Sequence, residues 1–267
     1  MREIGTEELK RIQLEILDVV MKFCEVNGIT CWLNGGTLLG AVRHKGYIPW
    51  DDDIDLGMLR PDYDRFMATF NGYNPRYRFS SAENDPESFT HFGKVFDTST
   101  ILYEPDEKGT RLSVYVDIFP MDNAPLNVDE QKKILRRRDI YTVCNLGRKL
   151  PVFLKPTRGG VFHVLAVYAF RAVLRVFPRH WFVRKLVENA RSCKDDTGLV
   201  GDFTGLRNAV YPAEYLRTVT AGEFEGKSYN LPAGWDGWLK ALYGDYMTLP
   251  PETERVSTHK FKAYWKD

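Results

Sequence analysis

The chain has 267 residues, which suits one large domain or two small ones with a buried core. Hydrophobic residues at 43%, charged residues at 27% and a net charge of +1 are typical of a soluble globular protein. No segment reaches the roughly 18 uninterrupted apolar residues of a membrane span, and the charged N-terminus lacks the apolar core of a signal peptide, so we expect a cytoplasmic protein.

The first 120 residues alternate between helical and strand-like patterns. Residues 6–26 form an amphipathic pattern that predicts a helix, with Thr6 as its cap. Further elements follow in chain order: a strand at 29–33, a helix at 37–43, a strand at 54–58, a helix at 61–70, and strands at 76–80, 91–97 and 113–119. This order indicates an α/β or α+β core.

The second half of the chain begins with a basic helical region. Between Lys132 and Lys194 there are 16 Lys and Arg against two acids, so this segment carries +14 and the remainder −13. Such segregation usually means that one face meets an anionic surface. A hairpin at 223–232 and a short helix at 233–247 are expected to follow. The four cysteines form no CxxC pair and are expected to be reduced thiols rather than a zinc site or a disulfide framework.

Four aspartates are crowded into five positions of "WDDDIDLGM". If residues 53–57 are extended, Asp53 and Asp55 point to one face, and Ile54 and Leu56 point into the core. Two carboxylates on one rigid strand suit a hard divalent cation, which would also offset their mutual repulsion. A surface acidic turn fits this apolar alternation poorly. A calcium EF-hand would need Gly and Glu at positions that hold Leu56 and Asp62.

Two other features could belong to the same site. Gly35 and Gly36, between a strand and a helix, could bring backbone N–H groups close to a phosphate, although a glycine pair is more often only a turn. Asp117 lies inside the apolar run "VYVDIF", where an acid is costly unless it is paired or bound to a metal. An edge-strand aspartate facing water is the alternative.

These motifs together resemble a known family. "WLNGGTLLGAVRHKGYIPWDDDIDLGM" is similar to the signature of the LicD family, which includes bacterial phosphocholine transferases and relatives of fukutin. This family lies within the nucleotidyltransferase superfamily. The similarity continues at "FGKVFD", "VDIFPMD", "FEGKSYNLP" and "YGDYMTLPP". It implies an α+β fold with a mixed sheet core flanked by helices: a catalytic core at 1–127, a basic helical insertion at 128–195, and a C-terminal part at 196–267 that packs back on the core.

The resemblance also implies an activity. Such proteins transfer a phosphorylated head group, phosphocholine or a polyol phosphate, from a CDP-linked donor such as CDP-choline or a CDP-polyol. The acceptor is a hydroxyl of a cell-surface glycan, such as lipopolysaccharide or teichoic acid, or of its lipid-linked precursor. A nucleotidyltransferase that moves an NMP onto a small molecule or protein is the alternative, and a non-enzymatic scaffold or metal buffer is a third. No motif for nucleic-acid recognition accompanies the basic segment.

The family's site residues can be mapped onto this chain. Asp53, Asp55 and Asp117 match the metal-binding and catalytic acids, which would hold Mg²⁺ or Mn²⁺, with two ions expected. Asp117 is the candidate that accepts the proton of the acceptor hydroxyl. The expected substrate contacts are Gly35, Gly36, Thr37, Arg43, Lys45, Lys94 and His259. The three bases in this set could equally be solvated surface residues, and His259 could be structural.

The basic segment suggests where the protein works. An apolar helix at 160–178, flanked by arginines and lysines, could lie in the surface of an anionic membrane. The flanking bases are Arg158, Arg179, Arg184 and Lys185. A buried core helix with solvated basic neighbours is the alternative. We therefore expect possible membrane contact through residues 148–191, at the inner face of the cell membrane.

Overall fold

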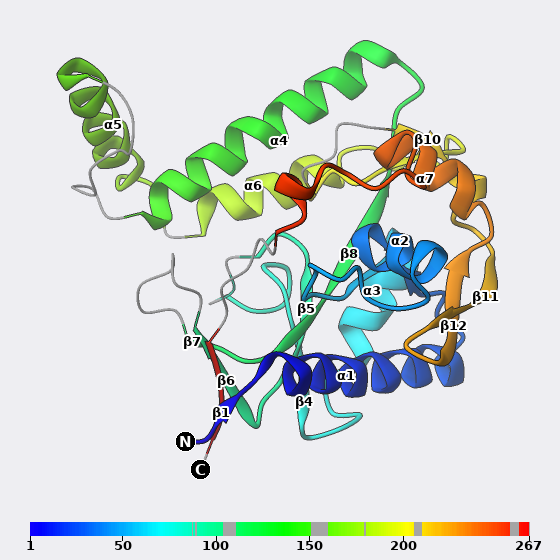
Figure 1. The fold of residues 1–267 in the computed structure, drawn as a ribbon. Coiled ribbons are helices and arrows are strands. Elements are labelled where there is room, and N and C mark those ends of the chain that lie inside the picture. The colour runs from blue at the N-terminus through cyan, green and yellow to red at the C-terminus, as the bar shows by residue number, and fades with distance from the viewer. Residues whose placement is uncertain are drawn as a thin grey trace.

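A computed structural model describes residues 1–86, 88, 90–103, 111–150, 160–178, 180–205, 210–256 and 262–266. It has the expected α+β architecture, with helices packed around a mixed sheet (Figure 1). The helices are α1 (Thr6–Asn27), α2 (Gly35–Arg43), α3 (Arg60–Thr69), α4 (Val128–Lys149), α5 (Val161–Leu174), α6 (Trp181–Ala190) and α7 (Trp235–Tyr243), with short 3₁₀ turns η1 (Ala213–Tyr215) and η2 (Glu252–Glu254).

The described strands form three sheets. The central mixed sheet holds β2 (Trp32–Leu33), β3 (Asp55–Leu59), β4 (Tyr77–Ser80), β5 (Gly93–Asp97), β8 (Tyr115–Asn123), β9 (Leu199–Gly201) and β10 (Val210–Pro212). A second sheet holds β1 (Glu3–Ile4), β6 (Thr100–Tyr103), β7 (Arg111–Leu112) and β13 (Lys262–Trp265). The third is the hairpin of β11 (Val219–Phe224) and β12 (Lys227–Pro232).

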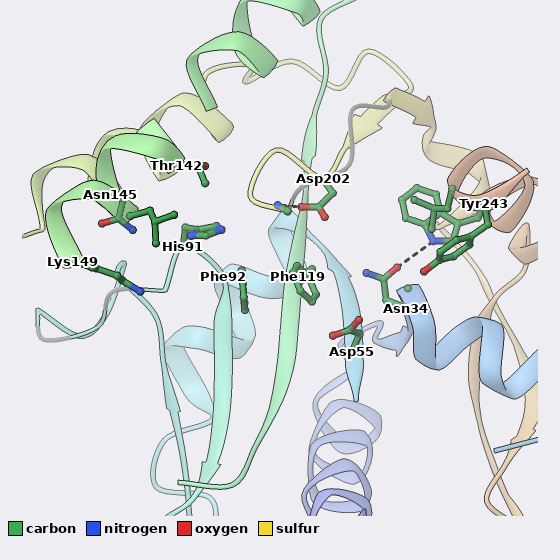
Figure 2. A pocket seen from close by; sticks show the side chains of 15 residues that line it. Asn34, Asp55, His91, Phe92, Phe119, Thr142, Asn145, Lys149, Asp202 and Tyr243 are labelled. Carbon is green, nitrogen blue, oxygen red and sulfur yellow. Dashed lines mark hydrogen bonds between the residues drawn. The ribbon is translucent and has the colours of Figure 1, made fainter. Parts of the chain in front are cut away.

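Strand β8 organises the central sheet. It pairs in parallel with β3 along one edge, while β5 pairs with its first half and β9 with its last two residues in antiparallel fashion. Between those two partners the second edge of β8 is open, around Phe119 and Pro120. Pro120 has no N–H group to leave unpaired there. Phe92, just before β5, and Asp202, just after β9, flank this opening (Figure 2).

The main core lies between the central sheet and helices α1 and α3. Both helices contact β8, and α1 also contacts β5. The apolar side chains that alternate with the aspartates lie in this core, since Ile54 is 1% exposed and Leu56 is fully buried. The alternation therefore orients the polar side chains of β3 away from the core.

The basic region folds as three helices. Helix α6 lies along α4, and Ile134 of α4 and Ala190 of α6 form a small apolar cluster with Ala124 and Phe203. Helix α5 extends away from the body at the end of α4 (Figure 1). Of its described residues only Arg171 and Leu174 are buried. The alternative of a buried core helix at 160–178 is therefore wrong. Among the described helices, none is long and apolar enough to cross a membrane.

Most expected elements are present, with corrected bounds. Gly5, not Thr6, occupies the N-cap of α1, and no side chain caps that end. The strand expected at 29–33 shortens to β2, whereas the one expected at 113–119 runs on to Asn123. All four cysteines are free; Cys24 and Cys31 are buried and the other two are half-buried. The division into three parts stays a prediction.

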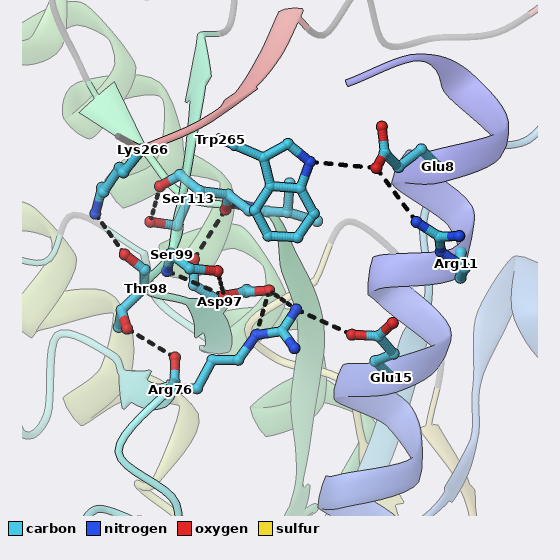
Figure 3. Close-up of polar contacts among 12 residues, drawn as sticks. Glu8, Arg11, Glu15, Arg76, Asp97, Thr98, Ser99, Ser113, Trp265 and Lys266 are labelled. Atoms are coloured by element: carbon cyan, nitrogen blue, oxygen red, sulfur yellow. Dashed lines mark hydrogen bonds and ion pairs between the residues drawn. The ribbon is translucent and has the colours of Figure 1, made fainter. Parts of the chain in front are cut away.

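A polar cluster joins the C-terminal strand to the rest of the fold (Figure 3). The Asp97 carboxylate is fully buried and accepts hydrogen bonds from Arg76 Nε at 3.0 Å and Nη2 at 2.6 Å. Its other oxygen accepts from Ser99, through the backbone N–H and the hydroxyl. Trp265 Nε1 donates to Glu8 on α1 at 3.2 Å. A buried carboxylate with a charged partner makes this cluster sensitive to substitution.

We expect Arg76→Gln to lower the free energy of unfolding by about 1–3 kcal/mol, because Asp97 would stay buried without the charged partner that the described residues provide. Urea denaturation measures the effect. Arg11→Gln is the matched control, since Arg11 pairs with Glu8 at 3.2 Å on the surface. Its loss should not change stability measurably. Equal losses in the two variants would contradict the role given to Asp97.

Candidate active site

The candidate site begins with a row of three charged residues across the central sheet. Asp55 of β3 is the register partner of Asp117 of β8, and Asp117 is in turn the partner of Lys94 of β5. Residues directly opposite each other on neighbouring strands project from the same face. Lys94 Nζ donates to Asp117 Oδ1 at 2.6 Å, and both side chains are buried. Asp55 and Asp117, which are 62 positions apart in sequence, are therefore neighbours on adjacent strands, as the sequence predicted.

The N-terminus of α2 lies directly against these acids. Gly35 has a φ of +53°, and a Cβ there would lie 2.9 Å from Asp55 Oδ2; a Cβ at Gly36 would lie 2.8 Å from Asp51 Oδ2. The Asp55 backbone N–H donates to Thr37 Oγ1 at 2.8 Å, which joins this helix turn to the start of β3. The glycine pair is therefore required for the close approach of backbone and carboxylates, which is more than a simple turn demands.

The crowding of acids perturbs Asp55. Burial raises the pKa of Asp55 well above its usual range, and the neighbouring carboxylates of Asp53, Asp117 and Asp51 raise it further, while Lys94 opposes the shift. Asp53 itself precedes β3, so only Asp55 of the expected pair lies within the strand. The side chains of Asp53 and Asp55 are nevertheless half-buried, whereas Ile54 between them is buried. This is an arrangement in which a cation would be strongly favoured.

Asp55 lines a pocket of about 460 Å³ (Figure 2). The pocket lies between the central sheet, α4 and α7. Its lining includes Asn34, Gly35, Asp55, His91, Phe92, Phe119, Thr142, Asn145, Leu146, Lys149, Asp202, Gly205, Trp238, Leu242 and Tyr243. Asn34 accepts a hydrogen bond from Trp238 Nε1 at 3.1 Å, which links α7 to the turn before α2. The phenyl rings of Phe92 and Phe119 pack with centroids 4.5 Å apart.

Sequence reasoning missed much of this lining. Thr142, Asn145 and Lys149 come from α4, in the basic segment that the sequence assigned to a separate insertion. Their spacing of three and four residues places them on one helix face, which is a signal that could have been read once the helix was known to pack on the core. Asp202 and the α7 residues likewise carry no local motif.

The other expected substrate residues have different positions. The Arg43 guanidinium donates to the Tyr246 carbonyl at 2.7 Å. Lys45 has a left-handed backbone conformation, and its backbone carbonyl accepts from the Glu225 N–H at 2.9 Å. Both join the α2 end of the core to C-terminal segments, and neither is among the described residues that line the pocket. His259 lies outside the described residues.

The surroundings of the acids bear on the alternatives. Strand β3, rather than a helix, follows the acidic run, which excludes an EF-hand. The half-buried acids at 51–53 also disagree with a freely exposed acidic turn. Among the described residues, no three His, Cys, Asp or Glu side chains are gathered closely enough to form a preassembled metal site. The carboxylate oxygens of Asp53, Asp55 and Asp117 are nevertheless the donor type that Mg²⁺ prefers.

We expect Gly35→Ala to lower the free energy of unfolding by about 2–4 kcal/mol, because the methyl group combines backbone strain with a collision against Asp55. Gly28→Ala is the matched control: its φ is +61°, but nothing lies within 4 Å of the added Cβ. That variant should lose only the strain, about 1–2 kcal/mol. Denaturation of both variants measures the difference, and equal losses would mean that Asp55 can move away from the helix at no cost.

Comparisons with known protein sequences identify the relatives of this chain. The family described as LicD/FKTN/FKRP, nucleotidyltransferase domain, matches residues 28–143. The chain is 32% identical to the lipopolysaccharide cholinephosphotransferase LicD of Haemophilus influenzae, over 99% of each chain. It is 51% identical to human ribitol 5-phosphate transferase FKRP over 43 residues, 16% of this chain and 9% of that one. Human ribitol-5-phosphate transferase FKTN is 33% identical over 76 residues, 27% of this chain and 16% of that one. The chain therefore belongs to the LicD family of transferases.

Proposed function

We propose that this transferase moves a phosphorylated head group, phosphocholine or a polyol phosphate, from a CDP-linked donor to a hydroxyl of a surface glycan or its lipid-linked precursor. The observation that carries the proposal is that Asp55 and Asp117 lie opposite each other on neighbouring strands, beside the N-terminus of α2. Asp55 and Gly35 of this group also line the pocket. The names of the relatives support the reaction class, because they describe transfer of cholinephosphate and of ribitol phosphate.

The chain's own residues can divide the reaction between them. Asp117 accepts the proton as the acceptor hydroxyl forms its bond to the phosphorus of the head group. The bond from that phosphorus to the bridging oxygen breaks, and CMP leaves with the electron pair. Lys94 lies 2.6 Å from Asp117 and supplies positive charge near the transferring group. The α2 N-terminus, open at Gly35 and Gly36, favours phosphate oxygens.

We propose that Asp53, Asp55 and Asp117 hold Mg²⁺ or Mn²⁺, and we expect two ions to take part in the reaction. Their oxygens fit a hard cation, and the pKa of Asp55 is raised by burial first and then by the neighbouring carboxylates, both of which a bound cation would offset. When bound, the metal would neutralise charge on the diphosphate and polarise the acceptor oxygen.

A panel of CDP-linked donors tests the proposed reaction. With Mg²⁺ and a glycan acceptor, we expect CMP to be released and the head group to appear on the acceptor. An NMP attached to the acceptor would instead support the alternative nucleotidyltransferase. Asp53→Asn and Asp55→Asn should lower transfer by about a thousandfold or more, as expected when a metal ligand is lost.

Two controls belong to the same experiment. Asp195→Asn, at an exposed position outside the pocket, should leave transfer unchanged. The free energy of unfolding without added metal should hold or rise in Asp55→Asn, because one of several crowded charges is removed. Near-normal turnover of Asp53→Asn or Asp55→Asn at saturating Mg²⁺ would overturn the metal assignment.

We also infer that α5 contacts an anionic membrane surface. Its apolar side chains are exposed: Phe162 is 88%, Val161 73%, Val173 60% and Leu165 57% exposed. The helix projects from the body within the segment that carries +14, so apolar and basic groups are presented together. The acceptor class explains why such contact would be useful, because a lipid-linked glycan lies at the membrane surface.

The double variant Phe162→Ser/Leu165→Ser should bind acidic vesicles about tenfold or more weakly than the wild type, since apolar burial is lost. Rising salt should weaken binding of the wild type. Leu126→Ser/Val128→Ser is the matched control, because both side chains are exposed but lie at the opposite end of α4. Vesicle co-sedimentation measures binding. A wild-type protein that ignores acidic vesicles at low salt would show that α5 serves another purpose.

A further inference from the structure

Two buried polar atoms at one end of the pocket lack partners. Asn145 Oδ1, on α4, and His91 Nδ1, before β5, have no hydrogen-bond partner among the described residues, although Asn145 is only 6% exposed. Figure 2 shows both side chains at the same end, with Phe92 and Phe119 between them and Asp55. A buried polar atom without a partner is costly, so its presence in a pocket points to a ligand group that satisfies it.

Both atoms can accept a hydrogen bond from a ligand. Burial lowers the pKa of His91 to about 4, with Lys149 and Lys94 adding to the shift, so the imidazole is neutral at pH 7. A neutral imidazole has one nitrogen that carries a hydrogen and one that presents a lone pair. With the hydrogen on Nε2, the unpartnered Nδ1 presents a lone pair to a ligand. The carboxamide oxygen of Asn145 is the second acceptor.

The ligand must then offer hydrogen-bond donors beside a flat apolar surface. Phe92 contacts the His91 ring at a centroid distance of 5.0 Å and Phe119 at 4.5 Å, so aromatic surface adjoins the two acceptors. The exocyclic amino group of cytosine has two N–H donors, whereas uracil has a carbonyl oxygen at the same position. A carbonyl oxygen placed there would face two acceptors and satisfy neither.

We propose that Asn145 and His91 read the base of the nucleotide donor, accepting hydrogen bonds from the amino group of cytosine while Phe92 packs against its ring. The proposal rests on the CDP-linked donor of the proposed function. It assigns the far end of the pocket to the base and leaves the diphosphate at Asp55. Helix α4 becomes part of donor recognition, and selection of cytosine over uracil becomes a property of this end.

Titration calorimetry with CMP and UMP, in the presence of Mn²⁺, tests the assignment on the full chain. The wild type should bind CMP about tenfold or more tightly than UMP. Asn145→Leu keeps the volume but removes the acceptor, so it should weaken CMP binding and reduce the preference to about threefold or less. Asn189→Leu is the matched control: Asn189 is 7% exposed and its Oδ1 also lacks a partner, but it lies on α6 outside the pocket lining. It should keep the full preference.

A change in the ligand gives a second test that needs no variant. The N4,N4-dimethyl derivative of CMP has no amino hydrogen and should bind the wild type about as weakly as UMP. Equal binding of CMP and UMP, or an unchanged preference in a folded Asn145→Leu, would overturn the assignment. If CDP-linked donors release CMP but a uracil nucleotide binds as tightly as the cytosine nucleotide, the base assignment would be overturned and the proposed function would stand. A clear preference for CMP without transfer from any CDP-linked donor would support the base assignment and overturn the proposed function.

Discussion

The parallel pairing of β3 with β8 is the constraint on which the site depends. It sets Asp55 opposite Asp117, and β5 completes the row with Lys94. A slip of one residue would turn one of the acids toward the core and expose Leu56 or Ile118, both of which are fully buried. The free energy of burying these apolar side chains therefore maintains the register that keeps the two carboxylates together. The repulsion between the acids is tolerated because the hydrophobic face of the same strands determines the pairing.

The turn before α2 adds a second constraint on the same acids. Its two glycines allow the helix N-terminus to approach Asp55 and Asp51 more closely than any other residue type would permit. The partial positive charge of the helix end stabilises nearby anions, whether they are carboxylates or the phosphate of a ligand. Asn34, whose side chain accepts from Trp238, links this turn to α7. The geometry of the acids therefore depends on packing between segments that are about 200 residues apart in sequence.

The basic region contributes one helix to the pocket and extends another away from it. One face of α4 closes the pocket through Thr142, Asn145 and Lys149, whereas α5 carries exposed apolar side chains away from the body. The basic segment thus has one part beside the pocket and another at the surface. Under the proposed function, a membrane-bound acceptor and a soluble donor would reach the same protein from different directions. The pocket and the exposed helix are joined by α4 itself.

The sequence by itself determined the α+β class, the order of the elements and the family. The alternation of apolar and polar residues and a long motif can both be read locally, without knowledge of the tertiary contacts. It also indicated that Asp55 and Asp117 belong together, since an acid inside an apolar strand needs a partner. Only the tertiary structure decided that Asp53 precedes the strand, that Arg43 and Lys45 contact C-terminal segments, and that Asn145 lies in the pocket. These outcomes depend on how separate elements dock. Docking is decided by the free energy of packing over the whole core, which no short stretch of sequence encodes.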